Sequence, residues 1–343
     1  MRFFKKPAFD SPIDKNVVLL SRSCFALKLI CETVAKRKQR KVTILFPDFF
    51  CGETLNALRD DNNVILQFYS INDEFEPEYS KINLSNSNVD LFVFVHFFGM
   101  YLNIAQAREF CNNIGSVLIE DCAHVLYPKV PFGTIGDYAI FSPHKCLPIV
   151  DGAMLKHNEC ANKEDWEEIK ANISSLPRFS ALKQYAINFG KNIFAVKAQG
   201  TYNPEAHYDA RKQSETPSRI SYISERILLT YSYDELVCYE KQRMKNLELL
   251  ETVMRHFPVK SMITNEGTSI PYFGYFMIVD VANAQRTANT LKTLGLPLGV
   301  WSYLPYEVKA TEITNAENFS TYCFSVPLHQ YVTKKQIMSI VCK

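Results

Sequence analysis

An acid and a lysine on neighbouring predicted strands form the pattern in this sequence that could do chemistry. Asp121 ends the apolar run Val117–Asp121, and Lys145 follows 24 residues later, just after a second run, Tyr138–Ser142. A carboxylate can hold the nitrogen of a pyridine ring protonated, and a lysine amine can form a Schiff base with an aldehyde. Pyridoxal phosphate (PLP) needs both contacts. The pair therefore predicts a PLP site in which Lys145 also moves the substrate proton.

Short apolar runs alternate with amphipathic runs of helix length around this pair. We expect strands at Val42–Phe46, Val64–Tyr69, Leu91–His96, Val117–Asp121 and Tyr138–Ser142, and helices at Ala26–Ala35, Glu53–Leu58 and Ile104–Asn113. This alternation is typical of an α/β fold with a mostly parallel sheet. Ligands of such sheets bind beyond the carboxyl ends of the strands, so Asp121 and Ser142 are expected at the ligand-binding edge.

The pattern changes in the second half of the chain. Residues 162–217 combine helical and loop segments, and a long helical stretch follows at Tyr222–Phe257. Beyond it we expect strands at Tyr272–Asp280 and Thr321–Ser325, and helices at Ala282–Leu294 and Lys334–Cys342. We therefore predict a large α/β domain over residues 1–240 and a smaller C-terminal α+β domain over residues 241–343.

The composition argues against several classes of protein. The 343 residues are 47% hydrophobic and 22% charged with a formal net charge of +2, which gives no electrostatic basis for binding nucleic acid or a membrane surface. No apolar run approaches the ~20 residues of a membrane helix, and no signal-peptide pattern follows the first charges. The ten cysteines lack the spacing of a disulfide framework or a metal site. We expect a cytoplasmic protein without a metal.

Five segments occur in the order of a known enzyme family. They are Val95–Gly99, Leu118–His124, Gly133–Ser142, Asn315–Glu317 and Phe324–His329. In these segments the chain resembles the DegT/DnrJ/StrS family of PLP-dependent sugar aminotransferases, which share the fold type I architecture of aspartate aminotransferase. The resemblance covers most of the chain. It implies that fold, PLP as the cofactor, and a homodimer, because the family's sites are completed by a neighbouring subunit.

The resemblance also implies roles for individual residues. Asp121 would bind the pyridine nitrogen, Lys145 would form the Schiff base, and His124 would lie against the ring or its O3′. Ser142 would donate its hydroxyl to the phosphate.

Two further segments resemble cofactor-binding parts of the family. Ser21–Cys24 looks like the phosphate turn ahead of the first helix, which places Arg22 and Ser23 near free backbone N–H groups. In the loop that supplies the ring-stacking aromatic, the matching residue is Cys51, and Phe50 is the alternative. The stacking assignment stays open.

The chain departs from the family pattern at several places. The loop between Ser142 and Lys145 is shorter, and Asp151 stands where the family has a glutamate. The segment Arg219–Tyr222 lacks the asparagine that reaches the partner subunit's phosphate, and Trp301–Tyr306 matches the substrate-histidine segment only loosely. These changes leave the cofactor chemistry intact and the acceptor substrate open.

The function implied by the resemblance is transfer of an amino group from an amino acid, with glutamate expected, to a nucleotide-linked keto-sugar, as in polysaccharide biosynthesis. Two alternatives remain. Dehydratases of the family carry a histidine in place of the lysine, and His144 is adjacent to Lys145. A non-catalytic relative that has lost turnover would also fit the altered phosphate and glycine positions.

Overall fold

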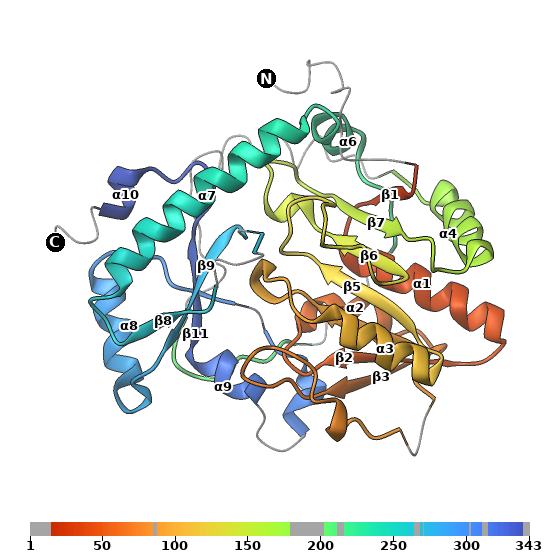
Figure 1. Ribbon diagram of the computed structural model, residues 1–343, viewed down its shortest axis with the longest axis horizontal. Helices are drawn as coiled ribbons and strands as arrows, with labels where there is room; N and C mark the ends of the chain where they lie inside the picture. The colour runs from red at the N-terminus through yellow and green to blue at the C-terminus, as the bar shows by residue number, and fades with distance from the viewer. Residues whose placement is uncertain are drawn as a thin grey trace.

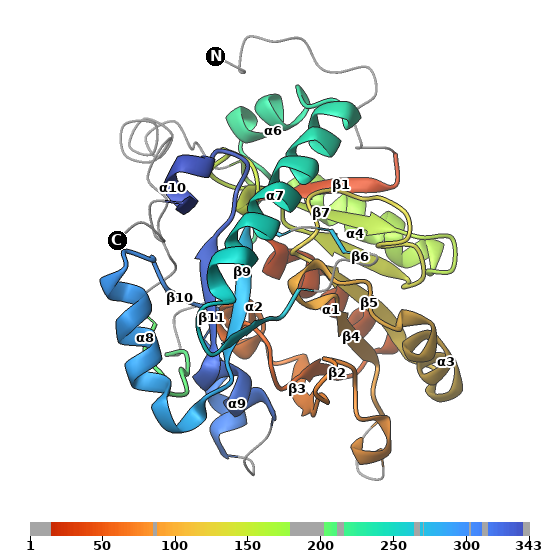
Figure 2. The same ribbon diagram turned by 60° about the vertical axis from the view of Figure 1, so that its left-hand side comes forward.

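A computed structural model describes residues 15–84, 88–178, 202–210, 216–263, 268–269, 271–301, 303–310 and 315–338. They form a seven-stranded and a four-stranded sheet that lie beside each other, with helices packed around both (Figure 1, Figure 2). One hydrophobic core runs through both parts: Leu45 of the larger sheet and Phe276 of the smaller sheet belong to the same buried cluster.

The seven-stranded sheet has the strand order β1-β7-β6-β5-β4-β2-β3. Its strands are β1 (Val17–Leu20), β2 (Val42–Pro47), β3 (Val64–Tyr69), β4 (Leu91–Val95), β5 (Val117–Cys122), β6 (Tyr138–Phe141) and β7 (Ala153–His157). Six of them run in one direction, and β7 alone runs antiparallel to them, between β6 and β1. Helices packed around the sheet are α1 (Ser23–Lys38), α2 (Gly52–Arg59), α3 (Ile104–Ile114) and α4 (Lys163–Ser175). Strands β2 and β4 are buried at every residue, as in a sheet covered on both faces.

The four-stranded sheet is antiparallel, in the order β10-β11-β9-β8. Its strands are β8 (Val259–Ser261), β9 (Phe273–Ile278), β10 (Gly299–Val300) and β11 (Cys323–Pro327). The remaining helices are α6 (Tyr222–Leu228), α7 (Tyr233–Met254), α8 (Ala284–Thr293), α9 (Asn315–Tyr322) and α10 (Lys334–Met338). No helix of the described ranges is long and apolar enough to cross a membrane.

The predicted α/β class with a mostly parallel sheet is confirmed, and each strand predicted in the first half is present within one residue of its expected end. The helical stretch predicted at Tyr222–Phe257 is instead two helices. Ser232 and Glu235 form a capping box that begins α7 anew, and such a box satisfies N–H groups that a continuous helix would have paired internally.

Other boundaries also differ from the expectation. Strands β1 and β7 were not predicted, and the first residues of the strand expected at Thr321–Ser325 belong to α9. The predicted closing helix is present as α10, and residues 339–343 lie outside the described residues. Helix α7 runs without a break through residue 240, so the division of the chain there stays a prediction.

Candidate active site

The predicted acid and lysine lie at the same edge of the seven-stranded sheet. Asp121 pairs with Ile140 on the adjacent parallel strand β6, and Lys145 lies in a 3₁₀ turn, Pro143–Lys145, shortly after that strand ends. The positive charge of Lys145 lowers the pKa of both Asp121 and His124, although burial dominates each shift. The structure therefore places Lys145 within electrostatic range of both Asp121 and His124.

Asp121 keeps capacity to accept further hydrogen bonds. Burial raises the pKa of its carboxyl, while Lys145, the Ala123 backbone and His96 oppose that shift. Among the described residues, its hydrogen bond comes from Ala123 N to Oδ1 at 2.8 Å. A carboxylate can accept about four hydrogen bonds, so Asp121 can also take one from a cationic ring nitrogen.

The tautomer of His124 follows from its partner. The backbone N–H of Phe98 donates to Nδ1 at 3.0 Å, so Nδ1 must be the acceptor. Burial, with a further contribution from Lys145, holds the pKa of His124 well below its usual value, and the ring is neutral. A neutral ring with an accepting Nδ1 carries its proton on Nε2, so His124 offers one N–H donor.

Phe98 provides this contact from a strained backbone. Its φ of 55° and ψ of 20° lie in the left-handed region, which a bulky residue rarely adopts. Gly99 follows with a φ of 75°, and a Cβ there would lie 2.0 Å from the carbonyl oxygen of Ser269. The turn after β4 is thus fixed by close packing against a segment that leads to the four-stranded sheet.

Ser142 supplies an unsatisfied donor next to the lysine. The residue is fully buried, and its hydroxyl has no hydrogen-bond partner among the described residues. Its carbonyl accepts from Lys145 N at 3.0 Å, which ties it to the lysine turn. Buried polar groups are almost always paired, so this hydroxyl is suited to donate to a ligand oxygen.

The turn before α1 lies on the same side of the site. Arg22 is the N-cap of α1; no side chain caps this end, and its first turn contains no acidic residue. Burial lowers the pKa of His144 to about 4, and the charges of Lys145 and Arg22 both contribute, so Arg22 and Lys145 lie near the same imidazole. Ser23 begins the helix and is partly exposed. Backbone N–H groups at such an end bind anions.

The imidazole of His144 is neutral and already engaged in a hydrogen bond. Its Nδ1 donates to the carbonyl oxygen of Gly152 at 2.8 Å, and its low pKa keeps it neutral. Lys145, in contrast, is exposed. This arrangement favours Lys145 over His144 as the reactive side chain.

The loop before α2 places Cys51 and Phe50 differently. Cys51 is the N-cap of α2 and is partly exposed. Phe50 is buried against Phe46, with ring centroids 4.8 Å apart. Of the two candidates for the ring-stacking position, only Cys51 therefore remains outside the core.

Several aromatic side chains near the site were missed by sequence reasoning. Tyr275 on β9 stacks on His124 with ring centroids 5.6 Å apart, and Trp301 lies edge-on to the same histidine at 6.4 Å. Trp301 also stacks on Phe49 at 4.1 Å. Because these residues lie in distant parts of the chain, no local spacing signals their meeting.

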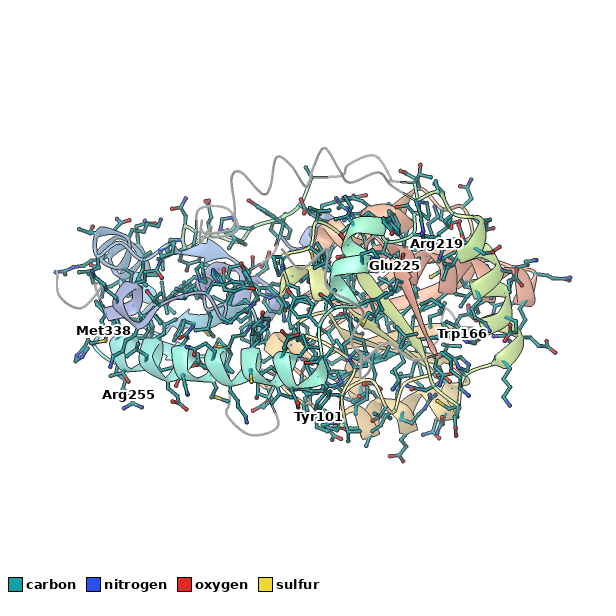
Figure 3. All side chains as sticks on the ribbon, turned by 90° about the horizontal axis from the view of Figure 1, so that it is seen from above. Tyr101, Trp166, Arg219, Glu225, Arg255 and Met338 are labelled. Atoms are coloured by element: carbon teal, nitrogen blue, oxygen red, sulfur yellow. The ribbon has the colours of Figure 1, made fainter. Side chains whose placement is uncertain are left out.

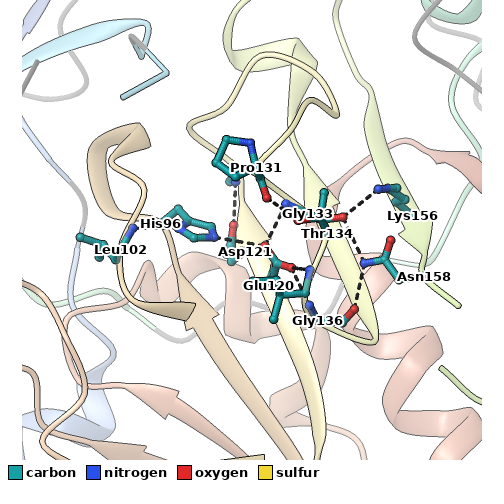
Figure 4. Close-up of polar contacts among 12 residues, drawn as sticks. His96, Leu102, Glu120, Asp121, Pro131, Gly133, Thr134, Gly136, Lys156 and Asn158 are labelled. Atoms are coloured by element: carbon teal, nitrogen blue, oxygen red, sulfur yellow. Dashed lines mark hydrogen bonds and ion pairs between the residues drawn. The ribbon is translucent and has the colours of Figure 1, made fainter. Parts of the chain in front are cut away.

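Glu120, the neighbour of Asp121, is a second residue that sequence reasoning missed. It has no exposed surface and accepts backbone N–H groups from Gly133 (2.8 Å), Ile135 (2.6 Å) and Gly136 (2.6 Å) (Figure 4). His96 lies 3.2 Å away and helps to hold the carboxyl pKa below its usual value against the effect of burial. The sequence did carry a signal for this residue, because Glu120 is an acid inside an otherwise apolar predicted strand.

His96, Glu120 and Cys122 are close enough together to hold a metal ion. Both carboxylate oxygens of Glu120 already accept hydrogen bonds, and burial raises the pKa of the Cys122 thiol well above its usual value. A metal would need the thiolate and a free carboxylate oxygen. The cluster therefore fits a structural hydrogen-bond network.

The segment Arg219–Tyr222 lies beside β1 of the same chain. Arg219 forms a β-bridge with Leu20, and the hydroxyls of Ser21 and Ser218 lie 2.6 Å apart. Ser221 donates from its N and Oγ to Asp151 at 2.8 and 2.7 Å. Asp151, the residue that replaces the family's glutamate, thus anchors this segment to the loop that follows Lys145.

Comparison with known proteins connects this geometry to one family. The model of the DegT/DnrJ/EryC1/StrS aminotransferase family matches residues 80–343. Among curated proteins, none matches the sequence.

Solved structures of aminotransferases share the fold at low sequence identity. PseC from Helicobacter pylori, an aminotransferase of pseudoaminic acid biosynthesis, is 13% identical, with a TM-score of 0.69 and 98% of both chains covered. NtdA from Bacillus subtilis, with bound cofactor PMP, is 12% identical, with a TM-score of 0.67 over 95% of this chain and 72% of its own. DesI, in the presence of its TDP-sugar product, is 16% identical, with a TM-score of 0.63 over 95% and 80%. These likenesses confirm the fold type.

Proposed function

The chain belongs to the DegT/DnrJ/EryC1/StrS aminotransferase family of PLP-dependent enzymes, and we propose that it transfers an amino group from glutamate to a nucleotide-linked keto-sugar. The observation that carries this proposal is the meeting of Asp121, His124 and Lys145 at one sheet edge. The acceptor class is supported by the fold shared with DesI, whose structure contains a TDP-sugar, and with PseC.

The described residues fit PLP. When bound, PLP supplies a conjugated ring that takes up an amino group and passes it on. The orphaned hydroxyl of Ser142 and the uncapped N-terminus of α1, with Arg22 and Ser23, offer donors suited to its phosphate. Cys51 is the residue of the α2 loop that we propose to lie against the ring.

Asp121 and His124 would orient the ring. Asp121 would accept a hydrogen bond from the ring nitrogen and keep that nitrogen protonated, because its described hydrogen bond from Ala123 leaves acceptor sites for it. His124 is fixed as an Nε2–H donor and can hold a ring oxygen in its ionised form.

Lys145 would do the proton transfer. Lys145 is exposed at the edge near Asp121 and His124. Its amine can therefore take the proton from the amino-bearing carbon of the donor in the first half-reaction and return it in the second. The same amine would be the residue that holds the cofactor.

We also propose that the enzyme is a cytoplasmic homodimer with a large domain at residues 1–240 and a smaller one at residues 241–343. A role in polysaccharide biosynthesis follows from the acceptor class. Sedimentation of the purified protein tests the dimer.

The visible spectrum of the purified protein with added PLP tests the assignment of Lys145. We expect an absorbance band that borohydride fixes covalently onto the peptide containing Lys145. Lys145→Ala should lose the fixed label, whereas Lys245→Ala, an exposed lysine on α7, should keep it.

Two results would contradict the proposal. Without a band in the wild type, the chain would be a scaffold that has lost its cofactor. A band together with loss of water from a keto-sugar, and no amino transfer from glutamate, would indicate the dehydratase alternative.

A further inference from the structure

Helix α7 carries a buried arginine that reaches the lysine turn. In Figure 3 the helix runs from Arg255, beside the end of α10 at Met338, to its other end near the middle of the molecule. Along this course, Leu250 and Met254 join the same core cluster as Phe276 of the four-stranded sheet. Arg243, between these ends, has no exposed surface and is the largest fully buried side chain of the described residues.

The guanidinium of Arg243 joins two backbone segments that are far apart in the sequence. Its Nε and Nη2 donate to Oε1 of Gln330 at 3.0 and 2.9 Å. Nη2 also donates to the carbonyl oxygen of Cys146 at 3.2 Å, and Nε2 of Gln330 donates to that same oxygen at 3.4 Å. Two donors, one from α7 and one from the loop after β11, therefore converge on the residue that follows Lys145.

The lysine turn depends on such external contacts because it is short. Its own hydrogen bonds run from Lys145 N to Ser142 O at 3.0 Å and from Cys146 N to Pro143 O at 2.9 Å. Leu147 N donates to the same Pro143 carbonyl at 2.8 Å. A single short turn with three such bonds has weak intrinsic stability. Besides the hydrogen bonds from His144 to the carbonyl oxygen of Gly152, the carbonyl of Cys146 is where α7 and the loop after β11 hold the turn.

We propose that Arg243, with Gln330, is a positioning residue that fixes the Lys145 turn relative to the four-stranded sheet. The inference rests on the proposed role of Lys145 as the reactive lysine. Displacement of a reacting group by about 1 Å can cost about 10²-fold in rate. An arginine fork buried between α7, Gln330 and Cys146 limits such displacement because its planar donors fix direction as well as distance.

Hydrogen exchange of the cofactor-free protein and steady-state kinetics of the loaded enzyme test the proposal together. Arg243→Gln should speed exchange of the amides of Lys145, Cys146 and Leu147 at least tenfold. It should also lower kcat at least tenfold with little change in the KM of the donor, since the donor's binding groups are not displaced. Arg243→Lys keeps a donor but not the planar fork. Its exchange rates and kcat should therefore lie between those of the wild type and those of Arg243→Gln.

Asn246 provides the matched control. One turn along α7, its Nδ2 donates to the carbonyl oxygens of His329 and Val332 at 3.2 Å each, so it holds the same loop without touching Cys146. Asn246→Ala should loosen residues 329–332 while leaving exchange at residues 145–147 and kcat unchanged. If Arg243→Gln fails to fold, Gln330→Leu removes the second donor to Cys146. It should change exchange at residues 145–147 and kcat in the same direction, by a smaller factor.

The proposal is overturned if exchange at residues 145–147 is unchanged in these variants, if it changes equally in Asn246→Ala, or if exchange rises while kcat stays the same. Because exchange is measured without PLP, a wild type that binds no cofactor would sink the proposed function while the exchange data still decide whether Arg243 holds the turn.

Discussion

Two regions of the molecule gather charged and polar side chains, and they differ in how far those side chains are hydrogen-bonded. The first is the sheet edge with Asp121, Ser142 and Lys145. The second, which we call the Arg59 cluster, consists of Arg59, Asp209 and Glu307. The edge leaves hydrogen-bonding capacity unused, whereas the Arg59 cluster uses nearly all of it.

The Arg59 cluster joins three segments. Arg59 on α2 is 2% exposed and donates to Asp209 (2.7 Å) and twice to Glu307 (2.8 Å each). It also donates to Asn56 at 2.7 Å, and its guanidinium lies 4.5 Å from the centre of the Tyr306 ring. Although burial lowers it, these hydrogen bonds raise the pKa of Arg59 above its usual value.

The contrast separates structural charges from functional ones. Glu120 and Asp121 are consecutive residues, yet Glu120 accepts hydrogen bonds from three backbone N–H groups and faces His96, while Asp121 accepts from Ala123 alone among the described residues. A saturated buried charge stabilises its surroundings. An unsaturated charge at a sheet edge costs stability, and such costs are typical of sites that bind a ligand.

The largest effect is expected from the saturated region. Arg59→Ala leaves the carboxylates of Asp209 and Glu307 without their shared cation, so the free energy of unfolding should fall by about 3–5 kcal/mol. Urea denaturation measures it. Glu307→Gln, at the more exposed end of the cluster, should cost roughly 1 kcal/mol. Equal losses in both variants would contradict a buried, saturated cluster.

The next effect concerns activity at the unsaturated edge. Asp121→Asn removes the charge that would keep the ring nitrogen protonated, and kcat should fall about 10²–10³-fold. The free energy of unfolding should stay equal or rise slightly, because burial already disfavours the ionised carboxyl. Single-turnover kinetics and urea denaturation of the same preparation measure both. A large loss of stability would place Asp121 with the structural charges.

Acid should lower the free energy of unfolding through His144, which lies beside Lys145 at the sheet edge. The guanidinium of Arg59 stays charged, because its pKa lies above its usual value. The pKa of His144 is about 4 in the folded protein, below the usual value for histidine, so the unfolded chain binds a proton that the folded chain does not. Stability is therefore present above pH ~6.5 and falls as the pH drops towards 4, by roughly 2 kcal/mol at pH 4.5. Urea denaturation from pH 7.5 to 4.5 measures this slope. His144→Asn should make the slope shallower without abolishing it, because burial also lowers the pKa values of His124 and His329. An unchanged slope would contradict the assignment.

The smallest effect isolates the orphaned hydroxyl. Ser142→Ala should weaken PLP binding several-fold, about 1 kcal/mol, with unchanged stability of the cofactor-free protein. The matched control is Ser224→Ala on α6, whose hydroxyl is also buried without a described partner. It should leave PLP affinity unchanged. Equal affinities in all three proteins, measured by fluorescence titration, would remove Ser142 from the phosphate site.

Local sequence patterns predicted much of the larger sheet and the position of Asp121 and Lys145 at one edge of it. The apolar strands around Val117–Asp121 and Tyr138–Ser142 fix the alternation of the fold, since a sheet covered on both faces requires such runs. Boundaries that depend on a cap, as at Ser232, were missed, because a helical period continues through a break.

The sequence by itself determined that an acid and a lysine follow neighbouring strands, and hence the cofactor class. Only the tertiary structure decided which charges are saturated. Arg59 and Glu307 are hydrogen-bonded although 248 residues separate them in the sequence, and Arg243 and Cys146 are hydrogen-bonded across 97 residues. Such pairs form when packing brings distant segments together, and no local period or spacing encodes them. The same packing leaves Asp121 and Ser142 with unused hydrogen-bonding capacity, and the proposed PLP site rests on that capacity.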